Sequence, residues 1–139
     1  MRSDLGIWYA RMRESHYATD VRNGVRHMHS TEAMEQTAVV DYLDVKGIPV
    51  FHIPNGGSRN KREAKNLKRQ GVKAGVPDLC IPVARRGYHG LFIEMKYGKN
   101  KLTEKQAEWL TLLSENGYKA VCCYGFDDAM RAIDWYFGL

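Results

Sequence analysis

Four short runs of apolar, β-branched and aromatic residues constrain the fold of this chain more than any other feature. They cover residues 50–53, 79–83, 91–96 and 119–124. Each has the length and composition of a buried strand and is bounded by turn residues. The polar turn Arg85-Arg86-Gly87 separates the second run from the third, and this predicts that these two strands pair as a hairpin.

Segments with helix signals flank these runs. The first helix begins at Ser30 or Thr31, whose hydroxyl caps its first turn, and Gly47 ends it. The last helix is predicted to begin with Asp127 as its cap. A further short helix is expected within residues 59–73.

One more helix connects the third and fourth strands. Thr103 with Gln106 three residues later is the capping-box pattern, and Gly117 ends the helix. A helical crossover suits parallel pairing of the strands it joins. We therefore expect an α/β fold with a mixed four-stranded sheet flanked by helices (an αβββαβ core), a domain over residues 31–139, an extension of unknown form over residues 1–30, and a C-terminal helix.

Composition narrows the class of protein. A chain of 139 residues fits one domain. Its net charge of +5, from 21 Lys and Arg against 16 Asp and Glu, favours a polyanionic partner. The start lacks the apolar core of a signal peptide and no run is long enough to span a bilayer, so we expect a soluble cytoplasmic protein. Cys80, Cys122 and Cys123 lack zinc-site spacing and are expected to be reduced, buried thiols.

Three charged residues gather on the predicted hairpin. Asp78 stands at the start of one strand, and Glu94 and Lys96 point to the same side of the other because strand side chains alternate. Two carboxylates about 4 Å apart repel by roughly 4 kcal/mol at an effective dielectric near 20. A hard divalent cation such as Mg²⁺ would relieve this repulsion, polarise a phosphodiester and activate a water. Lys96 would orient or help deprotonate that water and offset charge in the transition state.

A solvated surface pair is the alternative, because a Glu-x-Lys pair is common on exposed strands. The context argues against it. Ile93 and Met95 alternate with the charged pair, and Pro77 precedes the first acid. The glycines of the segment 71–75 allow close approach of a backbone to a ligand.

Three runs carry a resemblance to a known family. Gly-Val-Pro-Asp-Leu at 75–79, Phe-Ile-Glu-Met-Lys at 92–96 and Thr-Glu-Lys-Gln-Ala-Glu-Trp-Leu at 103–110 resemble the VRR-NUC nucleases of the PD-(D/E)xK superfamily. The likeness extends from about residue 31 to the C-terminus. It implies a restriction-endonuclease-like fold, dependence on Mg²⁺ or Mn²⁺, and hydrolysis of DNA, often of branched or otherwise structured DNA, in a phage or bacterial setting of replication, repair or recombination.

The resemblance also implies roles for individual residues. Asp78 and Glu94 would be metal ligands, Lys96 the catalytic lysine, and Glu32 the helix carboxylate that completes the site. At about 100° per residue Glu32 shares the helix face of the apolar residues whereas Glu35 lies towards the flank, so Glu32 is preferred and Glu35 is the substitute. Either acid could instead simply favour the helix N-terminus through its dipole.

Two further residues have a structural and a functional interpretation. As a capping-box residue Gln106 needs no other role, yet it resembles the glutamine that follows the lysine in this family and positions substrate or water. His52 ends a strand and could face the catalytic edge or lie in a polar loop.

The segment 59–73 is strongly basic, with Glu63 as its one acid. Such a stretch can be a solvated face, but beside a phosphodiesterase site it predicts a clamp for the DNA backbone. The predicted DNA-binding residues are Arg59, Lys61, Arg62, Lys65, Lys68 and Lys73, together with His52 and Asn55.

Other classes of function compete with the nuclease hypothesis. A non-catalytic DNA-binding module with the same fold is the main alternative. A nucleotide-binding enzyme finds little support, because Gly71 and Gly75 lack the lysine and hydroxyl that complete a P-loop. A homodimer is possible, and the sequence leaves the preferred DNA structure open.

Overall fold

The computed structural model describes residues 31–55 and 60–139. The predictions for the extension, residues 1–30, and for DNA binding by Arg59 lie outside these described residues.

The described elements follow one another in the predicted order of helices and strands. They are α2 (Glu32–Val45), β1 (Phe51–His52), α3 (Lys61–Arg69), β2 (Leu79–Ile81), β3 (Leu91–Lys96), α4 (Glu104–Glu115), β4 (Lys119–Tyr124) and α5 (Gly125–Phe137). The sheet has the strand order β1-β2-β3-β4. β1–β2 and β2–β3 are antiparallel, and β3–β4 is parallel. The mixed four-stranded sheet, the hairpin and the parallel crossover are thus confirmed.

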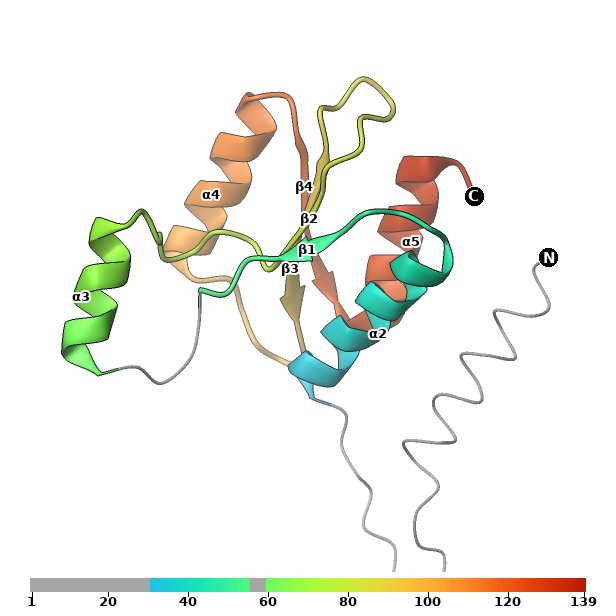
Figure 1. The fold of residues 1–139 in the computed structure, drawn as a ribbon. Coiled ribbons are helices and arrows are strands. Elements are labelled where there is room, and N and C mark those ends of the chain that lie inside the picture. The colour runs from blue at the N-terminus through green and yellow to red at the C-terminus, as the bar shows by residue number, and fades with distance from the viewer. Residues whose placement is uncertain (1–30, 56–59) are drawn as a thin grey trace, which may run out of the picture. The chain divides into compact units, whose positions relative to one another are not determined.

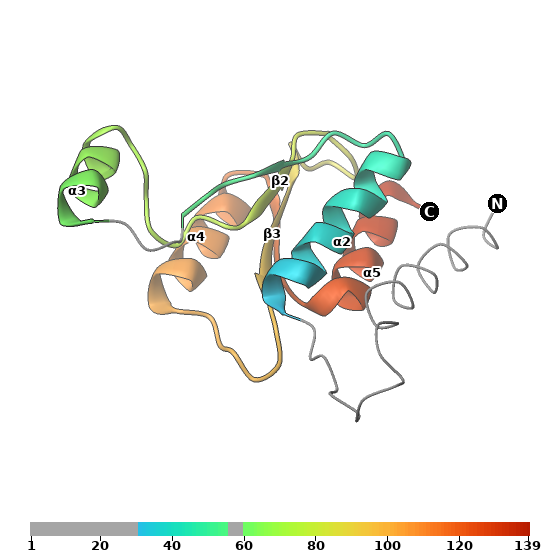
Figure 2. The same ribbon diagram turned by 60° about the horizontal axis from the view of Figure 1, so that its bottom comes forward.

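Helices cover both faces of the sheet. α4 lies on one face, and α2 and α5 lie side by side on the other (Figures 1 and 2). The core lies between the sheet and the α2–α5 pair, where Leu43, Leu79, Ile93, Ile133 and Tyr136 are fully buried. β3 is the central strand of the structure, and five of its six residues are buried. The strand that carries Glu94 and Lys96 is therefore paired with a neighbouring strand on each of its two edges.

Two predicted strands are shorter in the structure. The run 50–53 forms a strand only at Phe51–His52, and the run 79–83 ends its pairing at Ile81. Pro82 follows Ile81 and has no N–H to donate to a neighbouring strand, which accounts for the second shortening.

The capping box of α4 is confirmed, whereas the predicted cap of the last helix is wrong. α5 begins at Gly125, two residues before Asp127, and its N-cap residue makes no side-chain capping bond. Instead, the carboxylate of Glu35 on α2 accepts a hydrogen bond of 2.7 Å from the N–H of Phe126. A side chain from another helix thus accepts a hydrogen bond from a backbone N–H in the first turn of α5, and local sequence does not reveal such a cap.

The cysteines are unpaired, as predicted. Cys80 and Cys123 are buried and Cys122 is partly buried. None of the helices in the described part of the chain has the length and apolar character needed to cross a membrane.

Candidate active site

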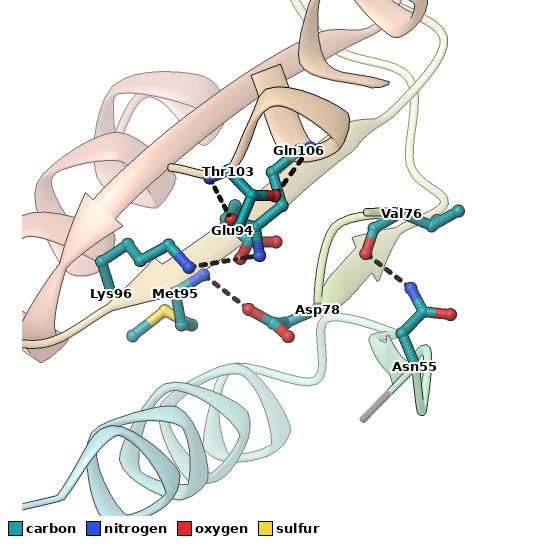
Figure 3. A network of polar contacts seen from close by, with 8 residues as sticks. All are labelled: Asn55, Val76, Asp78, Glu94, Met95, Lys96, Thr103 and Gln106. Atoms are coloured by element: carbon teal, nitrogen blue, oxygen red, sulfur yellow. Dashed lines mark hydrogen bonds and ion pairs between the residues drawn. The ribbon is translucent and has the colours of Figure 1, made fainter. Parts of the chain in front are cut away.

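The strand register places the three predicted residues of the centre together. Leu79 of β2 pairs with Ile93 of β3 in the antiparallel ladder. Asp78 immediately precedes β2, and its carboxylate reaches β3 at the N–H of Met95, close enough for its charge to act on Glu94. Lys96 lies two residues beyond Glu94 on the same side of β3. The sheet therefore brings Asp78, Glu94 and Lys96 to one end of the central strand (Figure 3).

Asp78 is held at both its side chain and its backbone. Its Oδ2 accepts a 2.7 Å hydrogen bond from the N–H of Met95, at the point where β2 has ended (Figure 3). Its backbone carbonyl accepts bonds of 2.8 Å from the N–H of Ile53 and from Nδ1 of His52. The carboxylate therefore has one fixed orientation towards β3.

Glu94 is only 2% exposed and has two protein partners. Nε2 of Gln106 donates to Oε1 of Glu94 at 2.6 Å, and Nζ of Lys96 lies 3.2 Å from the same oxygen (Figure 3). The oxygen of the Gln106 side chain meanwhile accepts from the N–H of Thr103 at 2.9 Å. One side chain thus completes the capping box of α4 and fixes Glu94, so the two interpretations of Gln106 are compatible.

Burial and neighbouring acids make Glu94 hard to ionise. The pKa of Glu94 is raised from 4.5 to about 7. Burial is the main cause and the negative charges of Asp78 and Glu32 contribute, while Lys96 opposes the shift. The raised pKa of Glu94 indicates that its surroundings hold too little positive charge to stabilise the ionised carboxylate. A cation at this point would favour its ionised form.

Glu32 and Glu35 have different surroundings. The charge of Glu32 reaches Glu94 strongly enough to raise its pKa. Glu35 lies one turn further along α2, where its carboxylate binds the backbone of Phe126 at the start of α5. The structure thus gives Glu35 a structural contact, and Glu32 influences the centre through its negative charge. That Glu32 is a metal ligand stays a prediction.

His52 braces the loop before the centre. Its Nδ1 lies 2.8 Å from the carbonyl oxygen of Asp78 and 3.1 Å from the terminal amide of Gln36. The atom of Gln36 nearest to the ring is Nε2, and a carbonyl oxygen only accepts, so Nδ1 donates to Asp78 in the tautomer that carries its proton there. The side chain remains exposed. A DNA contact would therefore fall to Nε2 of His52, and that role stays a prediction.

The loop that leads into Asp78 is tied to its neighbours at two points. The side-chain amide of Asn55 donates to the carbonyl of Val76 at 2.7 Å (Figure 3). Gly75 has φ +89°, and a Cβ there would lie 2.7 Å from the backbone of Lys105 on α4. The close approach expected of these glycines is thus an approach to a helix of the protein itself. Asn55 has a positioning contact, and its predicted contact with DNA stays a prediction.

Among the described residues, the predicted DNA-binding lysines and arginines of the basic stretch lie on α3, except for Lys73, which follows it. None of the residues of α3 is buried, and the helix stands away from the sheet (Figures 1 and 2). Asn60 caps it by accepting from the N–H of Glu63 at 2.8 Å. Lys61, Arg62, Lys65, Lys68 and Lys73 are all exposed.

The donor set fits a hard, partly hydrated cation better than zinc. Among the described residues no three His, Cys, Asp or Glu side chains form a ready-made metal cluster. Asp78, Glu94 and Glu32 do not already form such a cluster, and that Glu32 joins the other two carboxylates on a cation stays a prediction. Mg²⁺ needs only one or two carboxylates, because water and substrate phosphate complete its shell. Asp78 and Glu94 supply that number of oxygen ligands.

Comparison with family models decides the family. The model described as the VRR-NUC domain matches residues 30–127, more than two thirds of the chain. This chain belongs to the VRR-NUC family. All three members of the centre, Asp78, Glu94 and Lys96, fall inside the matched region. The resemblance stated from the sequence is confirmed, and with it a nuclease-like fold.

A solved structure supports the same assignment. A chain described as "VRR_NUC domain protein" is 39% identical to this one and superposes with a TM-score of 0.69, covering 80% of this chain and 91% of its own length. No curated protein matches. Membership of the VRR-NUC family suggests a nuclease activity with DNA as the substrate.

The sequence did not reveal one neighbour of the centre in this VRR-NUC domain. Cys122 pairs with Glu94 in the parallel register of β3 and β4, so it lies on the same side of the sheet. Burial raises the pKa of its thiol, and the negative charge of Glu94 adds to this while Lys96 opposes it. Parallel pairing was expected, but sequence gives no register for strands joined by a crossover.

Proposed function

We propose that this VRR-NUC protein is a Mg²⁺- or Mn²⁺-dependent DNA endonuclease. The observation that carries the proposal is the convergence of Asp78, Glu94 and Lys96 at one end of the central strand, with Glu94 buried and its pKa raised to about 7. We further propose that it acts on junction, flap or nicked DNA during replication, repair or recombination, in the cytoplasm of a bacterium or of a phage-infected cell.

Each residue of the centre has its own role in the proposed reaction. When bound at Asp78 and Glu94, with Glu32 as a further ligand, the cation supplies Lewis-acid activation of the phosphodiester and of a water. Lys96 places a positive charge 3.2 Å from Glu94, where it offsets negative charge that grows on the phosphate in the transition state. Gln106 keeps the carboxylate of Glu94 in one orientation, because its own side chain is anchored in the capping box.

DNA binding is assigned mainly to α3. Its exposed lysines and arginines carry charge that no packing within the described chain explains. Lys and Arg side chains on a surface neutralise phosphates and release counterions, and this dominates non-specific DNA affinity. We assign α3 and Lys73 to the DNA backbone, with a second copy of the chain as a possible partner on two-stranded substrates.

The test is metal-dependent cleavage. Purified protein is incubated with supercoiled and with branched DNA, with Mg²⁺, with Mn²⁺ or with EDTA. We expect nicking with either cation, none in EDTA, and a loss of roughly 10²-fold or more in Lys96→Ala, which is the scale for removing one charge-stabilising group. Lys101→Ala removes the same charge from an exposed loop residue and should cleave normally.

Binding decides between the two classes of function. DNA should still bind to Lys96→Ala, because the basic helix is intact. If wild-type protein binds DNA but shows no cleavage with either cation on any of these substrates, the chain is a non-catalytic DNA-binding module and the proposed activity is wrong.

A further inference from the structure

A group of aromatic and basic side chains lies at the end of the sheet opposite to the candidate active site. The turn between β2 and β3, the first residue of β4 and the end of α5 contribute to it (Figure 1). We call Arg85, Arg86, Tyr88, Lys119 and Trp135 the Trp135 cluster. The proposed active site does not include these residues.

Trp135 is the centre of this cluster. Cζ of Arg86 lies 4.7 Å from the centroid of its ring, and Nζ of Lys119 lies 5.0 Å from it. The ring of Tyr88 is 6.4 Å away, and Lys119 is also 5.8 Å from that ring. Trp135 nevertheless remains 46% exposed. Contacts within the described chain thus cover only part of this large side chain.

The three cations of the cluster have no acid partner within the described residues, where the ion pairs are Lys96 with Glu94 and Arg131 with Asp128. The acid next to Trp135 in sequence, Asp134, accepts a 2.6 Å hydrogen bond from the hydroxyl of Tyr42. Arg86 and Lys119 therefore place two positive charges beside the ring of Trp135 that form no ion pair within the described chain.

The backbone at Arg86 is unfavourable for an arginine. Arg86 and Gly87 both have positive φ, +52° and +82°, in a two-residue turn closed by hydrogen bonds between Arg85 and Tyr88. Such a turn favours Asn-Gly, because asparagine tolerates the left-handed region better than arginine does. A bond of 2.6 Å from Nε of Arg86 to the carbonyl of Trp135 holds the guanidinium on the cluster. Arg86 thus has a backbone conformation that arginine disfavours, and this indicates that its side chain has a role at this position.

We infer that the Trp135 cluster is a second contact for the phosphate backbone of DNA. Unpaired cations beside an exposed aromatic ring match the chemistry of a nucleic-acid strand. Lys119 pairs with Leu91 at the start of β3, and Glu94 lies three residues further along this strand, a distance of roughly 10 Å at about 3.3 Å per residue. One turn of duplex spans roughly 34 Å, so one duplex is long enough to contact both places. The inference rests on the proposed function only in taking DNA as the polyanion.

Binding measurements test the inference apart from catalysis. Arg86→Asn and Lys119→Gln are made in the Lys96→Ala background, and affinity for a duplex is followed against salt in EDTA. Each change should weaken binding about three- to tenfold and reduce the slope of log K against log salt by roughly 0.9, the value for one phosphate contact. Arg131→Gln, at an exposed residue of α5, is the matched control and should change neither quantity.

Thermal unfolding of the same variants separates this role from a structural one. Arg86→Asn puts the preferred residue into the turn, and Lys119→Gln leaves the turn untouched, so both should fold. If the melting temperature falls while affinity and salt slope match Arg131→Gln, the cluster only holds the turn against α5 and the inference is wrong. Unchanged DNA binding with unchanged stability, as expected for an acidic protein partner, also overturns it. Absence of DNA binding by the parent Lys96→Ala protein would count against the proposed function itself.

Discussion

The catalytic end of β3 and helix α3 are both rich in charged residues, but these residues are buried at the end of β3 and unburied on α3. Glu94 and Lys96 are 2% and 8% exposed, and each is bonded to a neighbour. No residue of α3 is buried, and the helix stands apart from the sheet (Figures 1 and 2). The fold fixes the positions of the charged side chains at the end of β3, whereas those of α3 are exposed to solvent.

The two regions therefore differ in how much their structure depends on tertiary packing. A short polar helix has little intrinsic stability, and most helical stability in proteins comes from packing. Ionised side chains in a core are tolerated only with partners, so one lost partner is costly there. Changes around the centre should therefore alter stability and chemistry, whereas changes on α3 should alter binding to an external polyanion.

The largest effect is expected where the loop before Asp78 meets α4. Gly75→Ala would place a Cβ 2.7 Å from the backbone of Lys105, whereas Gly71→Ala meets nothing within 4 Å although Gly71 also has positive φ. The two variants share the backbone cost, and only Gly75→Ala adds overpacking of about 1–3 kcal/mol. Chemical denaturation should show that extra loss, and cleavage should fall with it. Equal losses in both variants would contradict the close approach.

The two acids of α2 should respond in opposite ways. Glu35→Ala removes the partner of the N–H of Phe126 and should cost about 1.5–3 kcal/mol of stability, the range for a bond to a charged group. Glu32→Ala removes a negative charge near Glu94, so the metal-free protein should be as stable or more stable while cleavage at limiting Mg²⁺ falls. Thermal melts and Mg²⁺ titrations measure the two effects. Loss of stability in Glu32→Ala with normal Mg²⁺ dependence would reverse the assignment.

The pKa of Glu94 predicts how the stability of metal-free protein changes with pH. The folded state has the higher pKa, about 7 against 4.5, so it binds more protons than the unfolded state between these values. Stability should therefore fall as pH rises from about 4.5 to 7 and level off above. Thermal unfolding in EDTA should show this decline in the wild type and a smaller one in Glu94→Gln. Identical pH profiles would show that Glu94 ionises normally.

The smallest effects are expected on α3. Lys65→Ala or Lys68→Ala should weaken DNA binding several-fold and flatten its salt dependence by roughly 0.9 per lost phosphate contact, with no change in melting temperature. Glu63→Gln removes the one acid of the same helix and should strengthen binding slightly. Salt titrations of affinity provide the measurement. An unchanged slope in both lysine variants would make them ordinary surface residues.

Local signals in the sequence predicted the parts of the fold that depend on neighbouring residues. Thr103 and Gln106 predicted the start of α4, and the structure has both bonds of the capping box. The strand 119–124 was predicted at the bounds that the structure shows. Asp127 failed as a cap because Glu35, 91 residues away from Phe126, occupies that place. The sequence spacing of Glu94 and Lys96 indicated their common side, but not that the side would be buried.

The amino-acid sequence by itself determined the class of the fold, the common side of Glu94 and Lys96, and the family. These properties depend on alternation along one strand and on residue types at short spacing. Only the tertiary structure decided that Gln106 binds Glu94, that Asp78 binds the backbone of Met95, and that Glu35 caps α5. Such contacts join residues far apart in the chain, and their geometry depends on packing and register, which no local pattern encodes.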